Sequence, residues 1–432
     1  MTQVEEKALV HKMAWRVLPF LLLVYLICII DRLNVGFAAL TMNQDLGFTA
    51  TVYGWGAGLF FVGYFLGEVP SNLIMSKVGA RIWFTRIMIS WGIFAIAMGF
   101  ITGDVSFFVI RFLLGVAEAG FFPGVIYYLT LWFPAQYRGR IFGLFLIISP
   151  LNNTIAAPLA GLILNTFDGV MGYPGWRWLF IVEGIPAVLL AFVTLRVVID
   201  RPDNATWLTT EEKAHLRETL GREAASRTET KHLSLWQTLG NPKVLLFSVV
   251  YTSLAIGIYG IALWMPQIIK GMGLQDPLKI GLVMAVPYLI ATVCMVLWSR
   301  HSDKTGERVW HCAGPLALAS IGLACSAYAG SPLLAMISLT VAAIGLYCSQ
   351  PVFWAMPTSY LTGVAAAAGI AFINSIGNLG GFVGPFAVGW LKDHFGGFQA
   401  GLLFLSLCLL IGSIVAIVVG HRVTRSSVAQ IA

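Results

Sequence analysis

Twelve stretches of about 20 or more mostly apolar residues recur along the chain, and they limit its fold more than any other feature. A helix of that length crosses the roughly 30 Å hydrocarbon core of a bilayer. Only 11% of the residues are charged, against about 25% in soluble domains, so no large soluble domain fits. We therefore predict an all-α membrane protein with spans at residues 17–40, 52–75, 82–101, 106–132, 139–165, 177–198, 243–269, 279–299, 309–330, 333–356, 364–391 and 399–421.

Lysines and arginines indicate how these spans are oriented. They cluster before the first span, in every second gap and after the last span, whereas the other gaps hold only Arg177, Lys270, Lys279 and Lys392. By the positive-inside rule, both termini and the central loop are cytoplasmic. The net charge of +7 then reflects membrane topology and does not indicate nucleic-acid binding. We expect a multi-pass protein of a bacterial inner membrane, surrounded by the lipid bilayer.

A polar segment at residues 199–242 separates six spans from six. Within it, Thr209 and Glu212 have the spacing of a capping box, which predicts a short amphipathic helix. A regulatory domain is one interpretation of the segment, but its length favours a cytoplasmic linker. It would join a six-helix bundle at residues 1–198 to another at residues 243–432.

The motif K-x-G-x-R supports this division, because it occurs once in each half. It spans Lys77 to Arg81 after the second apolar stretch and Lys304 to Arg308 after the eighth. Matching motifs at matching turns are expected of duplicated bundles related by an axis along the membrane normal. We therefore predict two pseudo-repeated bundles of six helices each.

Four charged residues lie inside the apolar stretches: Asp31, Arg32, Arg111 and Glu118. A charge at mid-bilayer depth is costly and is by default a candidate functional residue. The Arg32 guanidinium is a rigid fork suited to two-point binding of a carboxylate. Arg111 and Glu118 are seven residues apart, so they share a helix face but are about 10 Å apart along it. We expect each to meet groups on other spans.

Several stretches resemble the major facilitator superfamily and, more narrowly, its anion:cation symporter family. They begin at Asp31-Arg32-Leu-Asn, Gly67-Glu-Val-Pro, Arg111-Phe-Leu-Leu-Gly and Trp132-Phe-Pro-Ala. The resemblance implies proton- or sodium-coupled transport of small organic anions by alternating access. It also implies that Asp31 and Glu118 carry protons, that Arg32 holds the substrate carboxylate and that Arg111 tunes the acid.

The resemblance extends to substrate-facing positions, which Tyr64, Trp354 and Asn374 match. Asn152 and Asn153 are adjacent amides in an apolar run, where they need polar partners that a substrate could provide. Asn378 shares a helix face with Asn374. We therefore predict a substrate site with the following residues: Arg32, Tyr64, Asn152, Asn153, Trp354, Asn374 and Asn378.

A second group of charged residues is assigned to gating at the cytoplasmic turns. Glu68 lies towards the cytoplasmic end of its span, where we expect contacts with the basic turn from Lys77 to Arg81. The matching turn contributes Asp303 and Arg308. Glu183, which we expect to lie half-solvated near the outer end of its span, is assigned a structural or gating role.

The leading hypothesis is a proton symporter that imports a small organic carboxylate, such as a sugar acid, a tartrate-like dicarboxylate or an aromatic acid, and that works as a monomer. The alternative within the same fold is a proton-coupled exporter of drugs or metabolites. An enzyme would need a nucleophile with a base, or a metal cluster, at membrane depth. All seven histidines lie in loops or near span ends, and neither H-E-x-x-H nor G-x-S-x-G occurs. We therefore predict no enzymatic activity and no cofactor or metal, with the proton favoured over sodium as the coupling ion.

Overall fold

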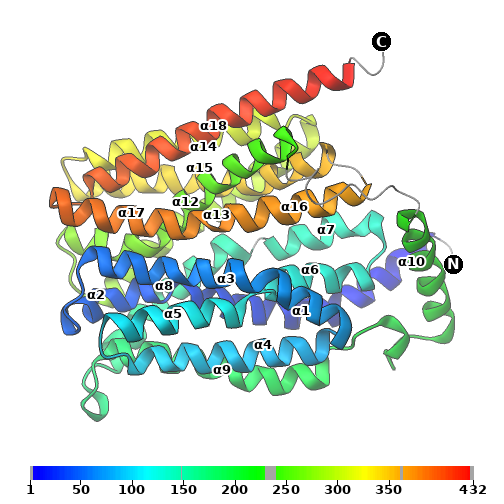
Figure 1. Ribbon diagram of the computed structural model, residues 1–432, viewed down its shortest axis with the longest axis horizontal. Coiled ribbons are helices and arrows are strands. Elements are labelled where there is room, and N and C mark those ends of the chain that lie inside the picture. The colour runs from blue at the N-terminus through cyan, green and yellow to red at the C-terminus, as the bar shows by residue number, and fades with distance from the viewer. Residues whose placement is uncertain (1–2, 147, 229–239, 361–362, 429–432) are drawn as a thin grey trace.

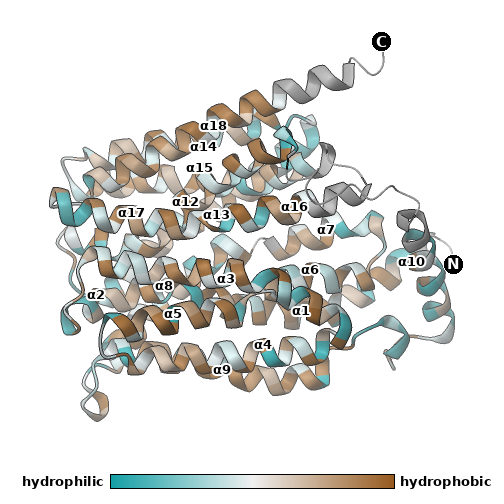
Figure 2. Cartoon of the chain, viewed as in Figure 1, coloured by the Kyte–Doolittle hydropathy of each residue, from teal (hydrophilic) through white to brown (hydrophobic). Residues whose placement is uncertain are grey.

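The computed structural model describes residues 3–146, 148–228, 240–360 and 363–428, and these residues are organised as helices joined by short turns. Among them are 12 helical segments long and apolar enough to cross a membrane, which confirms the predicted fold class. Apolar residues predominate along the packed helices, and polar residues gather at their ends (Figure 2). The chain is therefore a multi-pass membrane protein.

The first half of the chain forms six of these segments, several of them built from two consecutive helices. Their bounds are α1 Gln3–Leu33, α2 Val35–Asp45, α3 Ala50–Val78, α4 Ala80–Ala97, α5 Asp104–Glu118, α6 Phe121–Trp132, α7 Ala135–Leu146, α8 Ile148–Thr166 and α9 Gly175–Val197, with short 3-10 turns η1 Met98–Phe100 and η2 Val170–Gly172.

The second half forms the other six segments after a linker that holds η3 Pro202–Asn204 and α10 Thr210–Thr228. Its helices are α12 Pro242–Gly271, α13 Pro277–Thr305, α14 Val309–Ala327, α15 Pro332–Tyr360, α16 Gly363–Asn378, α17 Gly380–Phe395 and α18 Gln399–Val428. The start of α1, the helix α10 and the end of α18 lie at one end of the bundle, which we call the linker end (Figure 1). The turns after α2, η1, α8 and α17 lie at the opposite end, which we call the far end.

The two halves meet along two main helix pairs, α3 with α17 and α8 with α13. Glycines allow this close approach. A Cβ at Gly54 would lie 2.5 Å from the carbonyl oxygen of Pro385, and one at Gly161 would lie 2.4 Å from that of Pro277. Small residues bring helix backbones together in membranes, where van der Waals packing drives association. Glycine in these spans therefore serves the contact between the halves.

Polar contacts join the halves at the far end. The Asp393 carboxylate at the end of α17 accepts hydrogen bonds from the backbone N–H of Ala50 at 3.1 Å and of Thr51 at 2.7 Å, and from the Thr51 hydroxyl at 2.6 Å. It thereby caps the positive N-terminus of α3 from the other half. Asn165 also donates to Asp276 at 2.9 Å. These contacts hold the far end closed.

Replacing Asp393 with alanine should therefore favour a conformation that is open at the far end. Loss of a helix cap costs about 1–2 kcal/mol, so the open population should rise about 5- to 30-fold. Double electron–electron resonance between spin labels at Gln44 and Phe395 would report the change as a longer distance between the labels. The exposed Cys325 would be replaced beforehand so that it takes up no label. The exposed Asp104 at the same end provides a matched control as Asp104→Asn. An unchanged distance between the labels in the Asp393 variant would show that Asp393 does not hold the far end closed.

The linker helix α10 is attached to the first half. The predicted capping box is confirmed: the N–H of Thr209 donates to Glu212 at 2.8 Å, and the N–H of Glu212 donates to the Thr209 hydroxyl at 3.2 Å. Lys12 of α1 pairs with Glu212 at 2.9 Å. Trp132 of α6 stacks on Trp207 with ring centroids 5.6 Å apart. The linker is thus anchored on one bundle.

Candidate substrate and proton site

A cavity of about 70 Å³ lies between the two halves and receives side chains from α1, α3, α6, α8, α12, α15 and α16. Six of the seven residues predicted for substrate binding line it: Arg32, Tyr64, Asn153, Trp354, Asn374 and Asn378. They come from positions up to 346 residues apart in the chain, so the fold brings these six predicted residues together. Arg32 is the charged residue among the lining side chains, and the others are neutral.

Arg32 reaches from the cavity wall to Glu118. Its Nε donates to Oε1 of Glu118 at 2.9 Å, and its terminal Nη2 forms an ion pair with the same oxygen. Its Nη1 donates to the hydroxyl of Tyr259 at 3.3 Å, which belongs to the other half. The guanidinium carbon lies 5.1 Å from the ring centroid of Tyr64. The cation among the described residues that line the cavity is therefore already paired with an internal carboxylate.

Glu118 lies at a break in the fourth span, which the sequence predicted to be continuous from 106 to 132. The helix α5 ends at Glu118, and α6 begins at Phe121. Gly120 between them has φ +87°, and a Cβ there would lie 2.2 Å from the Ser71 hydroxyl oxygen, so both the turn and the packing require glycine. Glu118 is fully buried, and its Oε2 has no hydrogen-bond partner among the described residues.

Asp31 points away from the cavity, although it is adjacent to Arg32. Successive helix residues differ by about 100° in direction, so the two side chains diverge. Oδ2 of Asp31 accepts a hydrogen bond at 2.7 Å from the indole N–H of Trp91 on α4, a partner that the sequence analysis did not identify. Asp31 is 1% exposed, and Oδ1 has no partner in the described residues. It lies behind the substrate site, inside the first half.

Arg111 is also fully buried, and its contacts are with α3. Its Nη2 donates to the carbonyl oxygen of Ala57 at 3.1 Å, and its guanidinium carbon lies 5.0 Å from the ring centroid of Phe60. The structure pairs Glu118 with Arg32, so Arg111 can influence the acid only through space. A tuning role for Arg111 stays a prediction.

The asparagines divide into two groups. Asn153 faces the cavity and donates to the Tyr347 hydroxyl at 3.0 Å, which joins the halves. Asn152 does not line the cavity and is fully buried, so its predicted contact with substrate needs correction. Asn152 and Asn153 point in directions about 100° apart on α8, and Asn153 is the one that reaches the cavity.

Glu68 contacts the other half and not the basic turn that the sequence suggested. Its Oε1 accepts from the amide of Asn374 at 2.7 Å, and its Oε2 accepts from the hydroxyl of Ser375 at 3.1 Å. Both partners lie on α16. Since α3 runs between the halves, the Glu68 side chain turns sideways towards α16, whereas the turn from Lys77 to Arg81 lies more than two helix turns further along.

The two repeated turns make local contacts at the linker end. Lys77 and Arg81 have exposed side chains, and the N–H of Arg81 donates to Asp200 at 2.9 Å. In the second half, Arg308 pairs with Asp303 at 2.8 Å and donates to the Ser302 hydroxyl at 2.9 Å. Their predicted gating role therefore requires partners beyond those they have in this conformation.

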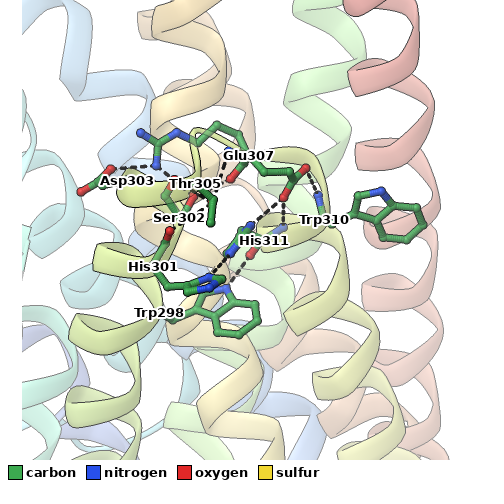
Figure 3. A network of polar contacts seen from close by, with 9 residues as sticks. Trp298, His301, Ser302, Asp303, Thr305, Glu307, Trp310 and His311 are labelled. Atoms are coloured by element: carbon green, nitrogen blue, oxygen red, sulfur yellow. Dashed lines mark hydrogen bonds and ion pairs between the residues drawn. The ribbon is translucent and has the colours of Figure 1, made fainter.

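A chain of polar contacts extends from the second turn into α14 (Figure 3). Glu307 accepts from the N–H of Trp310 at 2.7 Å and contacts Nδ1 of His311 at 2.6 Å. Nε2 of His311 lies 2.7 Å from Nδ1 of His301. Burial raises the pKa of Glu307, but the hydrogen bonds from Trp310 and His311 outweigh it and hold that pKa below its ordinary value of 4.5.

This shift gives a testable pH dependence. Because the pKa of Glu307 is lower in the folded protein, its carboxylate stabilises the fold above the unfolded-state pKa, and this stabilisation is lost as the pH falls through the folded-state value. Thermal unfolding measured from about pH 6 to about pH 3 should show a steeper decline for the unaltered protein than for Glu307→Gln. Glu211→Gln, at an exposed site on α10, is the control. Parallel declines would contradict the assignment.

Tyr25 is a cavity residue that was not predicted from the sequence. It lines the site from the same face of α1 as Arg32, about two helix turns away. Its ring stacks on that of Phe145, with the ring centroids 4.5 Å apart. The seven-residue spacing from Arg32 places both on one helix face, so helical periodicity could have indicated it. Tyr259 is the partner of Arg32, and only the packing of α12 against the first half reveals that role.

Known proteins are similar to this chain along nearly its whole length. The family model of the Major Facilitator Superfamily matches residues 21–385. A protein of Agrobacterium vitis whose name suggests tartrate transport is 50% identical, over 96% of this chain and 92% of that one. The quinolone resistance transporter of Acinetobacter baumannii is 44% identical, over 97% and 96%. A crystal structure of a bacterial homologue of the human lysosomal transporter Spinster has a TM-score of 0.78 at 16% identity, over 95% and 98%.

Proposed function

Because this chain belongs to the Major Facilitator Superfamily and is a membrane transporter, we propose that it imports a small organic acid anion together with protons. The observation that carries this proposal is the ion pair between Arg32 and Glu118 at the cavity wall. A buried arginine fork is suited to a carboxylate, and here an internal carboxylate occupies it.

The pair links proton binding to anion binding. While Glu118 is ionised, it competes with a substrate carboxylate for Arg32. Protonation of Glu118 removes that competition and leaves Arg32 as an unpaired cation, which favours an anion. Binding of either ligand then favours the other, and such reciprocal coupling is what symport requires.

The remaining cavity wall suits a hydroxylated or aromatic acid. Tyr64, Tyr259 and Asn153 offer hydroxyl and amide groups, and Trp354 offers an apolar face. We propose a tartrate-like dicarboxylate or a sugar acid as the first candidates, in keeping with the suggested substrate of the Agrobacterium relative. An aromatic carboxylate also fits this set of groups.

The proposed cycle follows from the closed far end. We assign the linker end to the cytoplasm, because arginines and lysines concentrate there, and the protein to a bacterial inner membrane. Opening of the far-end contacts at Asp393 with closure of the linker end would expose Arg32 to the outside. The halves would rock around a site near the bilayer midplane, and a single chain contains all of these parts.

Uptake into proteoliposomes of a panel of labelled organic acids tests the proposal. We expect one acid, with tartrate tried first, to accumulate under an inward proton gradient and to stop accumulating when a protonophore is added. Accumulation under a sodium gradient alone would show that sodium, and not the proton, is the coupling ion. Transport that depends on neither the proton gradient nor the sodium gradient would refute symport.

Export is the second candidate function, and the quinolone resistance relative is the observation that favours it. An exporter would exchange inward-moving protons for an outward-moving substrate. Everted vesicles distinguish the two directions, since they would accumulate substrate by antiport and lose it by symport under the same gradient. Accumulation of a quinolone with no transport of organic acids would favour export.

A further inference from the structure

A second and smaller cavity lies between the substrate site and the far end. It has a volume of about 10 Å³, room for roughly one water molecule. Asn34, Glu183 and Ala157 contribute to its lining from three different helix segments of the first half, and Met284 does so from the second half. Leu33 and Asn153 line both this cavity and the substrate cavity, so the two cavities are neighbours.

Glu183 is the unusual residue of this cavity. It is 5% exposed, and neither carboxylate oxygen has a hydrogen-bond partner among the described residues. The expectation that it is half-solvated was wrong, because α9 packs against α1 and α4 at this depth. Glu183 lies eight residues, or about 12 Å, from the far-end start of α9.

Asn34 faces the same space and is equally unusual. It is 4% exposed, and neither its amide nitrogen nor its amide oxygen has a partner among the described residues. It lies between α1 and α2 with helical backbone angles, φ −57° and ψ −26°, so the first span continues through it. Asn34 lies close enough to Glu183 to interact with its carboxyl group, but neither side chain makes a hydrogen bond of good geometry among the described residues. Two such buried polar side chains, facing one cavity of water size, are typical of a site that a small polar ligand completes.

The charged surroundings of Glu183 are sparse. Asp31, one turn before Asn34 on α1, acts on it electrostatically. The helix α8 carries no charged residue, and Arg86 of α4 lies towards the linker end. At the far end, Asp45 of α2 accepts from the indole of Trp176, and Arg177 donates to the carbonyl oxygen of Gly99. Arg32 of α1 lines the substrate cavity and pairs with Glu118, so no cation faces Glu183 from these neighbouring elements in the described structure.

We propose that Glu183, Asn34 and one water molecule form a proton-binding site on the outer side of Asp31. An ionised carboxylate buried without a cation is costly, whereas the neutral acid needs only hydrogen bonds, which the Asn34 amide and the water can provide. The site takes protons from the far end when that end opens, and holds one when it is closed. The route to Asp31 rests on the proposed function, because it assumes proton-coupled transport.

The transfer to Asp31 requires no other reactant. Asp31 does not itself line this cavity, so the transfer requires the water to move within reach of its Oδ1, which has no partner among the described residues. The O–H bond of the Glu183 carboxyl breaks as its proton bonds to the water, and a proton of that water bonds to Oδ1 of the ionised Asp31. Glu183 is left as a carboxylate and takes its next proton from outside. Glu183 would thus set how readily external protons reach Asp31, without touching the transported anion.

Infrared difference spectroscopy on the purified protein in lipid, with pH steps and no substrate, tests the site itself. The unaltered protein and Asp104→Asn should show a protonated-carboxyl band that Glu183→Gln lacks. Glu183→Asp should retain a shifted band, which would show that an acid and not merely a side-chain shape is required. A band that persists in Glu183→Gln, or that responds to sodium and not to pH, would overturn the proposal.

Uptake of labelled L-tartrate into proteoliposomes tests the route. Glu183→Gln should slow uptake driven by an external proton gradient severalfold and leave tartrate exchange at equal pH unchanged. Equal loss of both activities, or no loss of either, would overturn the relay. A protein that shows the band but does not couple tartrate to protons would support the site while refuting the proposed symport.

Discussion

Replacing Arg32 with alanine should weaken tartrate binding about 100-fold or more, at neutral and at mildly acidic pH. Truncation of one partner in a buried, hydrogen-bonded charge pair costs roughly 2–5 kcal/mol, and 2.8 kcal/mol is about 100-fold. The loss should be larger at the acidic pH, because protonation of Glu118 in the unaltered protein leaves Arg32 free for the anion. Calorimetric titration of the purified protein with tartrate would measure it.

Two further variants test whether the loss of binding is specific to the Arg32 guanidinium. Arg32→Lys keeps the charge but lacks the planar fork, so it should bind more weakly than the unaltered protein and more tightly than Arg32→Ala. Arg16→Ala removes an exposed cation near the linker end of the same helix and should bind normally. Unaltered affinity in Arg32→Ala would remove this residue from the substrate site.

Replacing Glu118 with glutamine should separate transport from the proton gradient. Glutamine resembles the protonated acid, so Arg32 would be free for the anion at every pH, and tartrate exchange should continue. For one coupled proton, a gradient of one pH unit supports up to about tenfold accumulation. The variant should lose this accumulation, and its binding should no longer depend on pH. Uptake and exchange in the same proteoliposomes would measure both effects.

The outcome for Glu118 depends on comparing the two activities. Glu118→Asp retains a titratable group and should retain part of the coupling, which distinguishes loss of the acid from loss of shape. Equal loss of exchange and of driven uptake in Glu118→Gln would assign the residue a structural role at the break between α5 and α6. Preserved accumulation would transfer the coupling role to another acid, with Asp31 the next candidate.

Long apolar stretches made the architecture predictable, because the cost of exposing polar backbone in lipid leaves few alternatives to spanning helices. The break in the fourth span after Glu118 was not predicted. A break of one or two residues leaves the length and hydropathy of a span unchanged, so composition does not reveal it. Gly120 and the nearby Pro123 were the local signals for this break.

The residues of the site were largely predictable, but their partners were not. Charged residues inside long apolar stretches are easily recognised in a sequence, so Arg32 and Glu118 were identified without a structure. That they pair depends on which helices are adjacent, and an adjacency between the first and fourth spans is a property of the packed bundle. For Glu68, nearness in sequence favoured the basic turn, whereas the side chain meets α16 of the other half.

The asymmetry of the cavity wall has a consequence for how such a protein diversifies. Among the described residues that line it, the cation Arg32 comes from the first half, and the second half contributes neutral side chains such as Tyr251, Gln350 and Asn378. Substitutions in the second half can therefore reshape the cavity for a different cargo without altering the ion pair with Glu118. Evolution can therefore change the substrate specificity while the proposed proton coupling through Arg32 and Glu118 is kept. One ancestral transporter could in this way give rise to descendants that carry chemically different solutes.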